Sequence, residues 1–175
     1  QEKREKRKMA KRSPQLKLFK PNEMAFGGIL MTTRKGRSQP RPLSTRHTIH
    51  LVLKSSIATG DLSFTRPKNK EIVEKSINSI SKKYFVAVLR VANVGNHLHL
   101  HIKLGKRHFY YSFIRALTGV LAKRILRANG AKLNGKKFWD YRPFSRIVIG
   151  LRAYLGIRDY IAINKLEGLG FDRLK

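Results

Sequence analysis

The sequence contains no cysteine among its 175 residues. This absence excludes disulfide bonds, thiolate zinc sites and cysteine nucleophiles, and it leaves the redox compartment undetermined. Acidic residues are also scarce, because 10 Asp and Glu stand against 39 Lys and Arg and leave a formal net charge of +29. Such an excess needs a polyanionic partner, for which nucleic acid is the usual candidate. Charge alone does not separate an enzyme that acts on nucleic acid from a protein that packs it.

Long apolar runs are missing as well. No run approaches the roughly 20 residues that span a membrane, and no short apolar segment near the start is typical of a secretory signal. We therefore expect no membrane partner and a cytoplasmic location. The length suits one domain with an ordinary hydrophobic core.

The first 46 residues are strongly basic. They open with "QEKREKRKMAKR", which lacks an apolar stripe, and end with "RKGRSQPRPLSTR", which holds five cations and no acid. We predict that residues 1–46 form a disordered or extended arm that binds nucleic acid, and that residues 47–175 form a compact domain. The five cations are Arg34, Lys35, Arg37, Arg41 and Arg46. A tail that charge merely keeps in solution is the alternative interpretation.

The rest of the chain alternates between strand and helix patterns. Period-two alternation and β-branched residues predict strands within 46–56, 84–93, 97–104 and 136–149. The last strand is expected at a sheet edge, because Pro143 cannot donate a ladder hydrogen bond. Helical spacing of apolar residues predicts helices within 66–84, 109–130 and 151–166. The turn "NVGN" joins the second and third strands into a hairpin.

This order of elements, β-α-β-β-α-β followed by a helix, predicts an α+β fold of ferredoxin-like topology with an antiparallel sheet. In that topology the first and third strands are central neighbours, and the two crossover helices cover one face. The added C-terminal helix is then free to pack across the other face.

Three of the six histidines fall within "GNHLHLHIKL". His97, His99 and His101 occupy alternate places and share one face of the strand, while the intervening apolar residues point to the other. His50 of the first strand is expected on the same face. Neutral imidazoles two residues apart can bind one metal ion from the same side. A nucleic-acid enzyme would use such an ion to stabilise charge on a phosphate.

The C-terminal helix offers a nucleophile and oxygen ligands. Tyr160, Asn164 and Glu167 lie at i, i+4 and i+7, hence on one helix face. A tyrosine there could attack phosphorus and form a phosphotyrosine. Tyr154 lies six residues earlier, about 240° around the helix, so we expect only one of the two tyrosines to face the histidines. Tyr110, Tyr111 and Tyr141 are further candidates, and the Asn164 spacing favours Tyr160.

Several of these motifs match a known group of enzymes. His97, Leu98 and His99 resemble the His-hydrophobic-His signature of the HUH single-strand nucleases. Within that superfamily, "GNHLHL" on a third strand resembles the single-tyrosine HUH transposases, specifically the REP-associated tyrosine transposases. The basic lead "RKGRSQPRPLSTRHTIHLVLK" and the helical "DYIAIN" are similar to that group too. The resemblance extends over most of residues 28–169.

The resemblance implies a catalytic domain over residues 47–175 and a role for each matching residue. Tyr160 would become linked to a 5′ phosphate while a 3′ hydroxyl is released, and His97, His99 and Asn164 would bind Mg²⁺ or Mn²⁺. The implied substrate is single-stranded DNA next to a hairpin, and the implied location is the bacterial nucleoid. Two questions stay open: whether the protein is a monomer or a homodimer, and whether Tyr160 acts within its own subunit.

Two positions depart from the pattern of the group. After Asn164 many relatives have Pro and a basic residue, where this chain has "KLEG", and His101 usually corresponds to an apolar or small residue. The ligand set therefore stays open. His101, His50 and Glu167 are further candidates for binding the metal or for contacts around it, and each histidine could instead be structural.

Further basic residues could track a DNA backbone. These candidates are Lys106, Arg107, Arg115, Arg142 and Arg146, with a merely solvated surface as the alternative. Phe138 and Trp139 are predicted to pack in the core. Two functions follow: a metal-dependent strand transferase, which the intact His-His-Tyr-Asn set favours, or a non-cleaving protein that binds hairpin DNA or RNA on a ferredoxin-like scaffold.

Overall fold

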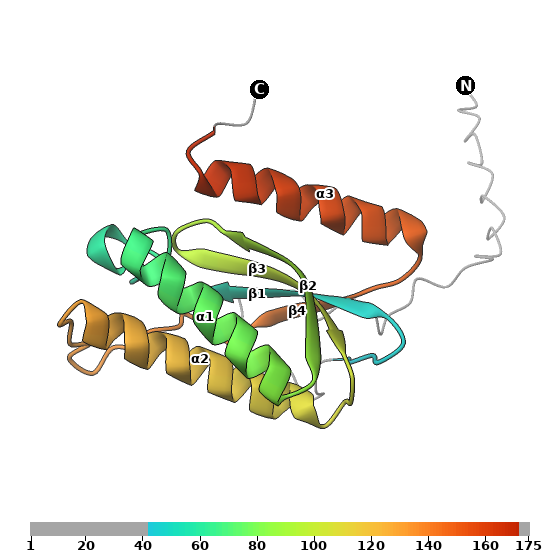
Figure 1. Ribbon diagram of the computed structural model, residues 1–175, viewed down its shortest axis with the longest axis horizontal. Coiled ribbons are helices and arrows are strands. Elements are labelled where there is room, and N and C mark those ends of the chain that lie inside the picture. The colour runs from blue at the N-terminus through green and yellow to red at the C-terminus, as the bar shows by residue number, and fades with distance from the viewer. Residues whose placement is uncertain (1–41, 172–175) are drawn as a thin grey trace, which may run out of the picture.

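The computed structural model describes residues 42–171, which form a four-stranded antiparallel sheet with helices on both faces (Figure 1). The elements are β1 (Thr48–Lys54), a short 3₁₀ helix η2 (Gly60–Leu62), α1 (Pro67–Lys83), β2 (Val86–Asn93), β3 (His97–Leu104), α2 (Phe109–Ala128), β4 (Phe144–Val148) and α3 (Leu151–Gly168). The strand order is β2-β3-β1-β4. The predicted ferredoxin-like topology with an added C-terminal helix is confirmed.

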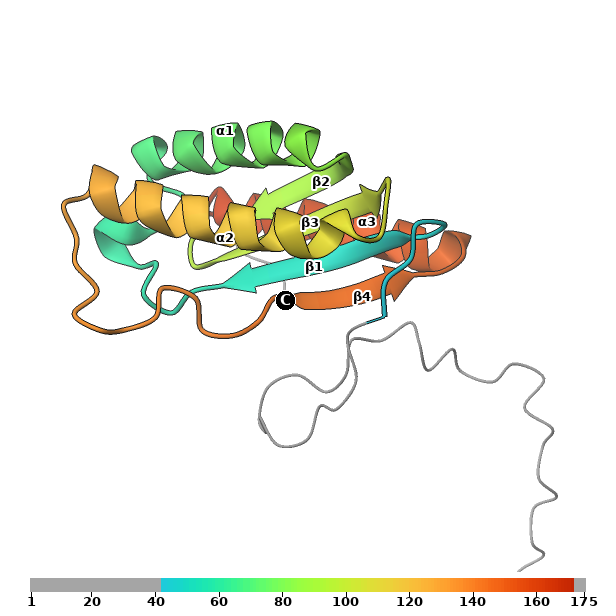
Figure 2. The same cartoon turned by 90° about the horizontal axis from the view of Figure 1, so that it is seen from below.

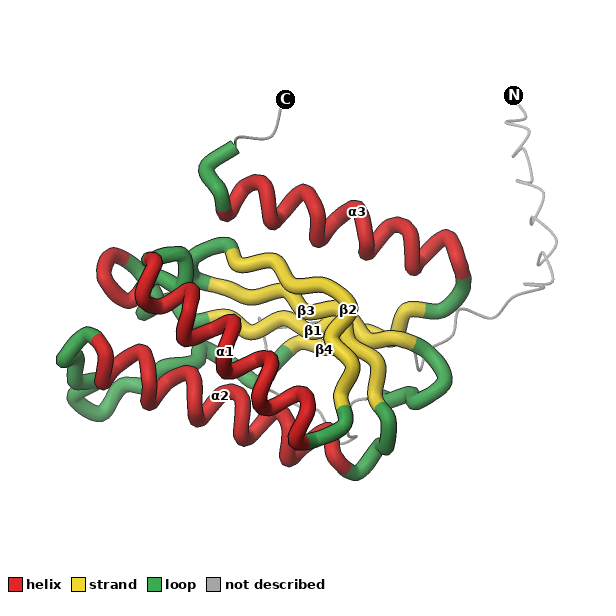
Figure 3. The backbone as a smooth tube through the Cα atoms, viewed as in Figure 1, coloured by secondary structure: helices red, strands yellow, loops and turns green. Residues whose placement is uncertain are grey.

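The two faces of the sheet are covered differently. Helices α1 and α2 pack side by side on one face (Figure 2), whereas α3 crosses the other face alone (Figure 3). Strands β1 and β3 are neighbours at the centre, with Leu51 opposite Leu100 and Leu53 opposite Leu98. The expected placement of the crossover helices and of the C-terminal helix is therefore correct.

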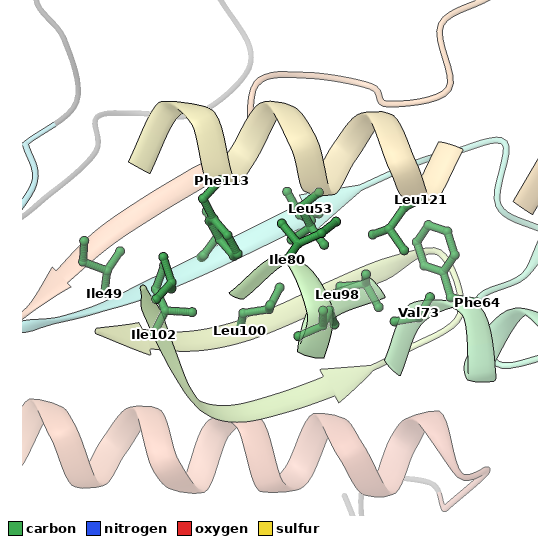
Figure 4. Packing of buried hydrophobic residues seen from close by; sticks show 14 of the residues in the cluster. Ile49, Leu53, Phe64, Val73, Ile80, Leu98, Leu100, Ile102, Phe113 and Leu121 are labelled. Carbon is green, nitrogen blue, oxygen red and sulfur yellow. The ribbon is translucent and has the colours of Figure 1, made fainter. Parts of the chain in front are cut away.

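The hydrophobic core lies between the sheet and the α1/α2 layer. Alternation along β1 and β3 sends the leucines and isoleucines toward the helices, where Leu51 and Leu100 are fully buried. Phe113 and Leu121 of α2 meet them from above the strands, and α3 lies beyond the sheet (Figure 4). One face of the sheet thus holds the core and leaves the other for polar side chains.

The fourth strand is shorter than predicted. It begins at Phe144, because Pro143 lacks the N–H that a ladder requires, and the residues before it form turns. Its predicted edge position is correct. Phe138 is buried, and Trp139 packs against Phe64 with ring centroids 5.7 Å apart while its indole N–H donates to the carbonyl of Thr118. Both side chains therefore pack in the core as predicted.

Most of the predicted arm falls outside the described residues. Its candidate DNA contacts Arg34, Lys35, Arg37 and Arg41 lie in residues 1–41, so the division at residue 46 stays a prediction. None of the helices within residues 42–171 is long and apolar enough to cross a membrane.

Candidate functional site

The histidines line the sheet face that α3 crosses. His99 and His101 are buried and His97 is partly buried on β3. His50 is buried on β1, where it pairs with His101 across the ladder. The period-two prediction that these four side chains share a face is correct.

Helix α3 runs antiparallel to β3 over the histidine row. The ring centroid of Tyr154 lies 5.1 Å from that of His101, and the ring of Tyr160 lies edge-on to His99 at 5.3 Å. Farther along α3, the carboxylate of Glu167 is close enough to His97 to act on its pKa. Residues of α3 about two turns apart therefore meet successively earlier histidines of β3.

The prediction that only one tyrosine faces the histidines is wrong, because Tyr154 and Tyr160 both contact them. A separation of 240° one way around a helix is 120° the other way, so the two rings reach the sheet from opposite flanks of α3. Six helical residues rise about 9 Å, and the histidine row is long enough to offer each tyrosine a different partner. Of the two, Tyr160 also contacts His50, with ring centroids 5.8 Å apart.

The residue before His97 sets the tautomer of its ring. Nδ1 of His97 lies 2.6 Å from Oδ1 of Asn96. Because an amide oxygen only accepts hydrogen bonds, Nδ1 of His97 carries the proton and donates it. The Nε2 atom then holds the lone pair, which is the form of histidine that binds metal ions.

His99 has one nitrogen engaged and one unpaired. Its Nδ1 lies 3.1 Å from Nε2 of His50, and the two rings stack at an interplanar angle of 11°. Within the described part of the chain, Nε2 of His99 has no hydrogen-bond partner although it is buried. A buried nitrogen without a partner destabilises a fold unless a ligand occupies it.

All four histidines of this face are held neutral. Burial lowers the pKa of His99 to about 3, with smaller contributions from His50 and His97. Burial likewise lowers the pKa of His50 to about 4, assisted by His101 and Arg146. The pKa values of His97 and His101 are lowered too, again mainly by burial. Neutral rings keep their lone pairs available at physiological pH.

Asn164 joins the backbone of α3 to the site. It is buried, and its Nδ2 donates to the carbonyl of Tyr160 at 2.7 Å, one turn earlier. Because the amide N–H is used within the helix, the Oδ1 atom is the group left to act as an acceptor or ligand. The predicted i, i+4 relation of Tyr160 and Asn164 is thus a direct hydrogen bond in the structure.

The residues present fit a divalent metal ion. His97 and His99 follow each other on one face, with ring centroids 4.8 Å apart, and the unpaired Nε2 of His99 is the group that such an ion would satisfy. Within residues 42–171, no three His, Cys, Asp or Glu side chains are grouped for a metal. Asn164, buried on α3 one turn after Tyr160, is a candidate for a further ligand through its Oδ1 atom.

His50 and His101 occupy supporting positions. Nε2 of His50 faces His99 and not open space. Nε2 of His101 lies 2.7 Å from Oγ1 of Thr48, and its ring packs on Tyr154. Nδ1 of His101, like Nε2 of His99, is buried without a hydrogen-bond partner in the described structure.

The predicted basic residues are dispersed. Arg146 is the ladder partner of His50, and Arg142 lines a pocket together with His97. Arg115 is exposed on α2, which covers the opposite face of the sheet. The remaining candidates are exposed in loops outside this site: Lys106 and Arg107 between β3 and α2, and Arg46 before β1.

Two basic residues at the site were missed by the sequence analysis. Lys54 lies opposite His97 in the ladder, and Nη1 of Arg90 donates to the hydroxyl of Tyr154 at 3.3 Å. Lys54 lies four residues after His50 on β1, so strand alternation was enough to predict that both side chains lie on the same face. Arg90 follows an irregularity in the pairing of β2 between Val88 and Arg90, so its parity could not be counted along the sequence.

Fold and site together define a class: an α+β protein of ferredoxin-like topology in which a histidine pair on the sheet meets a tyrosine on an added helix. A family model described as "Transposase IS200 like" matches residues 44–164. The chain belongs to this family of transposases, in agreement with the resemblance seen in the sequence.

Two solved structures are similar to this chain, and the first of them supports the fold. One is the structure of a REP-associated tyrosine transposase bound to a REP hairpin, with a TM-score of 0.54 and 16% identity over 69% of this chain and 67% of that chain. Another is a candidate transposase from Deinococcus radiodurans R1, with a TM-score of 0.49 and 17% identity over 75% of this chain and 98% of that chain. No curated protein matches the chain.

Proposed function

We propose that this transposase nicks and rejoins single-stranded DNA next to a hairpin, with Tyr160 as the nucleophile and with Mg²⁺ or Mn²⁺ held by His97, His99 and Asn164. One observation carries the proposal: Tyr160 stands edge-on to His99 and His50, and the buried Nε2 of His99 lacks a partner in the described structure. At 40% exposure, Tyr160 is also accessible to a DNA strand.

The reaction exchanges one phosphodiester for another. The hydroxyl of Tyr160 loses its proton and its oxygen attacks phosphorus, the bond from phosphorus to the 3′ oxygen breaks, and the 3′ hydroxyl leaves with a proton. The product is a 5′-phosphotyrosine, which a second 3′ hydroxyl resolves by the reverse reaction. The metal ion, when bound, stabilises negative charge on the phosphate oxygens in the transition state.

The protein's own side chains orient these groups. Asn96 bonds Nδ1 of His97 and sets its tautomer, and His50 contacts Nδ1 of His99. The Nε2 atom of each ring is therefore not used in these contacts. Asn164 is bonded to the carbonyl of Tyr160, which couples the amide ligand to the nucleophile. Arg146 and Lys54 supply positive charge beside the histidines.

Hairpin DNA is the proposed partner for two reasons. The net charge of +29 favours a polyanion, and the structurally similar REP-associated transposase is bound to a REP hairpin. A protein acting on such DNA would be associated with the bacterial nucleoid.

The test uses single strands that carry hairpins from the genomic neighbourhood of the gene, labelled at the 3′ end. Because the 5′ phosphate becomes linked to tyrosine, the labelled 3′ fragment should move with the protein on a denaturing gel. The adduct should form with Mn²⁺, disappear with EDTA and be absent for Tyr160→Phe. Tyr154→Phe is the matched control, since it keeps the ring against His101 and should still form adduct.

Two outcomes would contradict the proposal. An adduct formed equally well by Tyr160→Phe would show that another nucleophile acts. Tight binding of the hairpin without adduct at any metal concentration would favour the alternative of a non-cleaving DNA-binding protein.

A further inference from the structure

Helix α3 leaves part of the histidine face uncovered. It packs mainly on β2 and also contacts β3 and β4, but it contributes no residue to a pocket of about 210 Å³ that opens over the ends of β1, β3 and β4. The pocket is lined by Lys54, Asn96, His97, Tyr141, Arg142 and Phe144 among others. The pocket therefore adjoins the proposed metal site at His97, and its lining contains no residue of α3.

We propose that this pocket holds one nucleotide of the single strand, adjacent to the reacting phosphate, with the base on Tyr141 and the phosphate between Lys54 and Arg142. The inference rests on the proposed function and adds a nucleotide-binding subsite to it. The sequence analysis did not predict that Tyr141, Lys54 or Arg142 contacts a base.

The chemistry of the lining matches a nucleotide. Tyr141 is 48% exposed, so an aromatic face is available for stacking, and Phe144 adds a second aromatic ring. Stacking on aromatic side chains beside cations is the usual way in which proteins bind single-stranded nucleic acid. The planar guanidinium of Arg142 can bind a phosphate with two hydrogen bonds, and Lys54 adds a point charge.

The pocket is small and open to solvent. Sites for drug-sized ligands enclose roughly 300–1,000 Å³, and this pocket encloses about 210 Å³. One base fits such a space better than two stacked bases. The pocket therefore suits a nucleotide that is turned out of the stack of the strand.

The pocket is connected to the proposed catalytic site through shared residues. His97 lines the pocket and also lies against His99, with ring centroids 4.8 Å apart. Asn96 lines the pocket as well and bonds Nδ1 of His97. A nucleotide seated there would place its neighbouring phosphate near the histidine pair, and the ring of Tyr160 lies 5.3 Å from that of His99.

Binding is measured in the Tyr160→Phe background, so that no cleavage is needed. The probe is the 3′-labelled hairpin strand, and fluorescence anisotropy gives its Kd. Tyr141→Ala should raise the Kd about tenfold, as expected for the loss of one stacked base, and Tyr141→Phe should stay within about twofold. Tyr111→Ala, which removes an exposed tyrosine from α2 on the opposite face, is the matched control and should leave the Kd unchanged.

A second measurement identifies the bound nucleotide. Probes with a single abasic site at each unpaired position are compared on the Tyr160→Phe protein with and without Tyr141→Ala. At one position the abasic site should raise the Kd of the Tyr160→Phe protein about tenfold. The same abasic site should leave the Kd of the protein that also carries Tyr141→Ala unchanged. Arg142→Ala should reduce the salt slope of log Kd by about 0.7, and Arg127→Ala on α2 should not.

The inference is overturned if Tyr141→Ala binds as tightly as Tyr111→Ala, or if no abasic position loses its effect in the Tyr141→Ala protein. These outcomes are separate from those of the proposed chemistry. Coupling between Tyr141 and one base without any adduct would support the pocket and reject the nuclease. Adduct formation without such coupling would support the nuclease and reject the pocket.

Discussion

His99 combines burial with an unused nitrogen. Its Nδ1 is engaged by His50, and its Nε2 lacks a partner in the described structure. Both features follow from two neighbouring strands that carry histidine on the same face. An arrangement of this kind destabilises the protein alone and becomes favourable once a cation accepts the lone pair.

The contact between His50 and His99 predicts a change in metal affinity. His50→Phe keeps a ring of similar shape but removes Nε2, so His99 loses the group that orients it. Partners of this kind typically change metal affinity by about 10–100-fold. We expect Mn²⁺ affinity to fall by that factor in calorimetric titrations. His108→Phe, which alters an exposed histidine in the loop before α2, is the control; equal effects of the two substitutions would contradict a role for His50.

The lowered histidine pKa values predict a dependence of stability on pH. Because His50 and His99 titrate near 4 and 3 in the folded protein and near 6.5 when unfolded, the unfolded chain binds protons first as pH falls. Stability is therefore complete above pH 6.5 and is lost toward pH 4, by up to about 1.4 kcal/mol per pH unit for each group. Urea unfolding of the metal-free protein at pH 7 and pH 5 measures the loss. A midpoint that does not fall would disprove it.

At the scale of elements, α3 carries the proposed nucleophile and has few buried residues. Only Ile161 and Asn164 of this helix are buried, and the ring of Tyr154 lies between Arg90 and His101. The C-terminal end approaches β2 so closely that a Cβ at Gly168 would lie 1.9 Å from the carbonyl oxygen of Asn93. The position of the proposed nucleophile therefore depends on a few contacts along the helix.

The close approach at Gly168 predicts opposite effects for two glycines of α3. Gly168→Ala forces the last turn away from β2, because the clashing atom is backbone, and should reduce adduct formation at least tenfold by displacing the proposed nucleophile and ligand. Gly156 has no atom within 4 Å of an added Cβ, so Gly156→Ala should raise stability by about 1 kcal/mol. Thermal unfolding and the adduct assay measure both; equal behaviour of the two variants would contradict the packing of α3.

At the scale of the whole molecule, the sheet separates two functions. Its α1/α2 face buries the apolar core, and its other face presents histidines beneath α3 and an open pocket beside it. Positive charge is not confined to this face, since Arg115 lies on α2 whereas Arg146 lies beside His50. The charge favours a polyanionic partner, and in the proposed function the histidine face would receive one phosphate of it.

The arrangement within one chain predicts action in the same subunit. Tyr160 already contacts His99 of its own chain, so no partner is needed to bring the proposed nucleophile to the metal ligands. A mixture of the Tyr160→Phe and His99→Ala proteins should form no adduct, and size-exclusion chromatography of the active protein supplies its oligomeric state. Recovery of wild-type adduct in the mixture would show instead that tyrosine and histidines of different subunits combine.

Local sequence patterns determine which side chains share a face within each strand and helix of this protein. Alternation along β3 alone places His97, His99 and His101 on one face, because the pleat turns each side chain opposite to the last. Helical periodicity alone places Asn164 one turn after Tyr160. The order of these elements is enough to predict the ferredoxin-like topology and the side of the sheet that α3 crosses.

Only the tertiary structure decided how these groups meet. The contact of both tyrosines with the histidines depends on the path of α3 across the sheet, and the missed Arg90 depends on an irregular strand pairing. Lys54, Tyr141 and Arg142 come together from a strand end and a loop nearly ninety residues later in the chain. Periodicity reports which way a side chain points within its own element, but which atoms it then touches depends on distances between elements that packing sets.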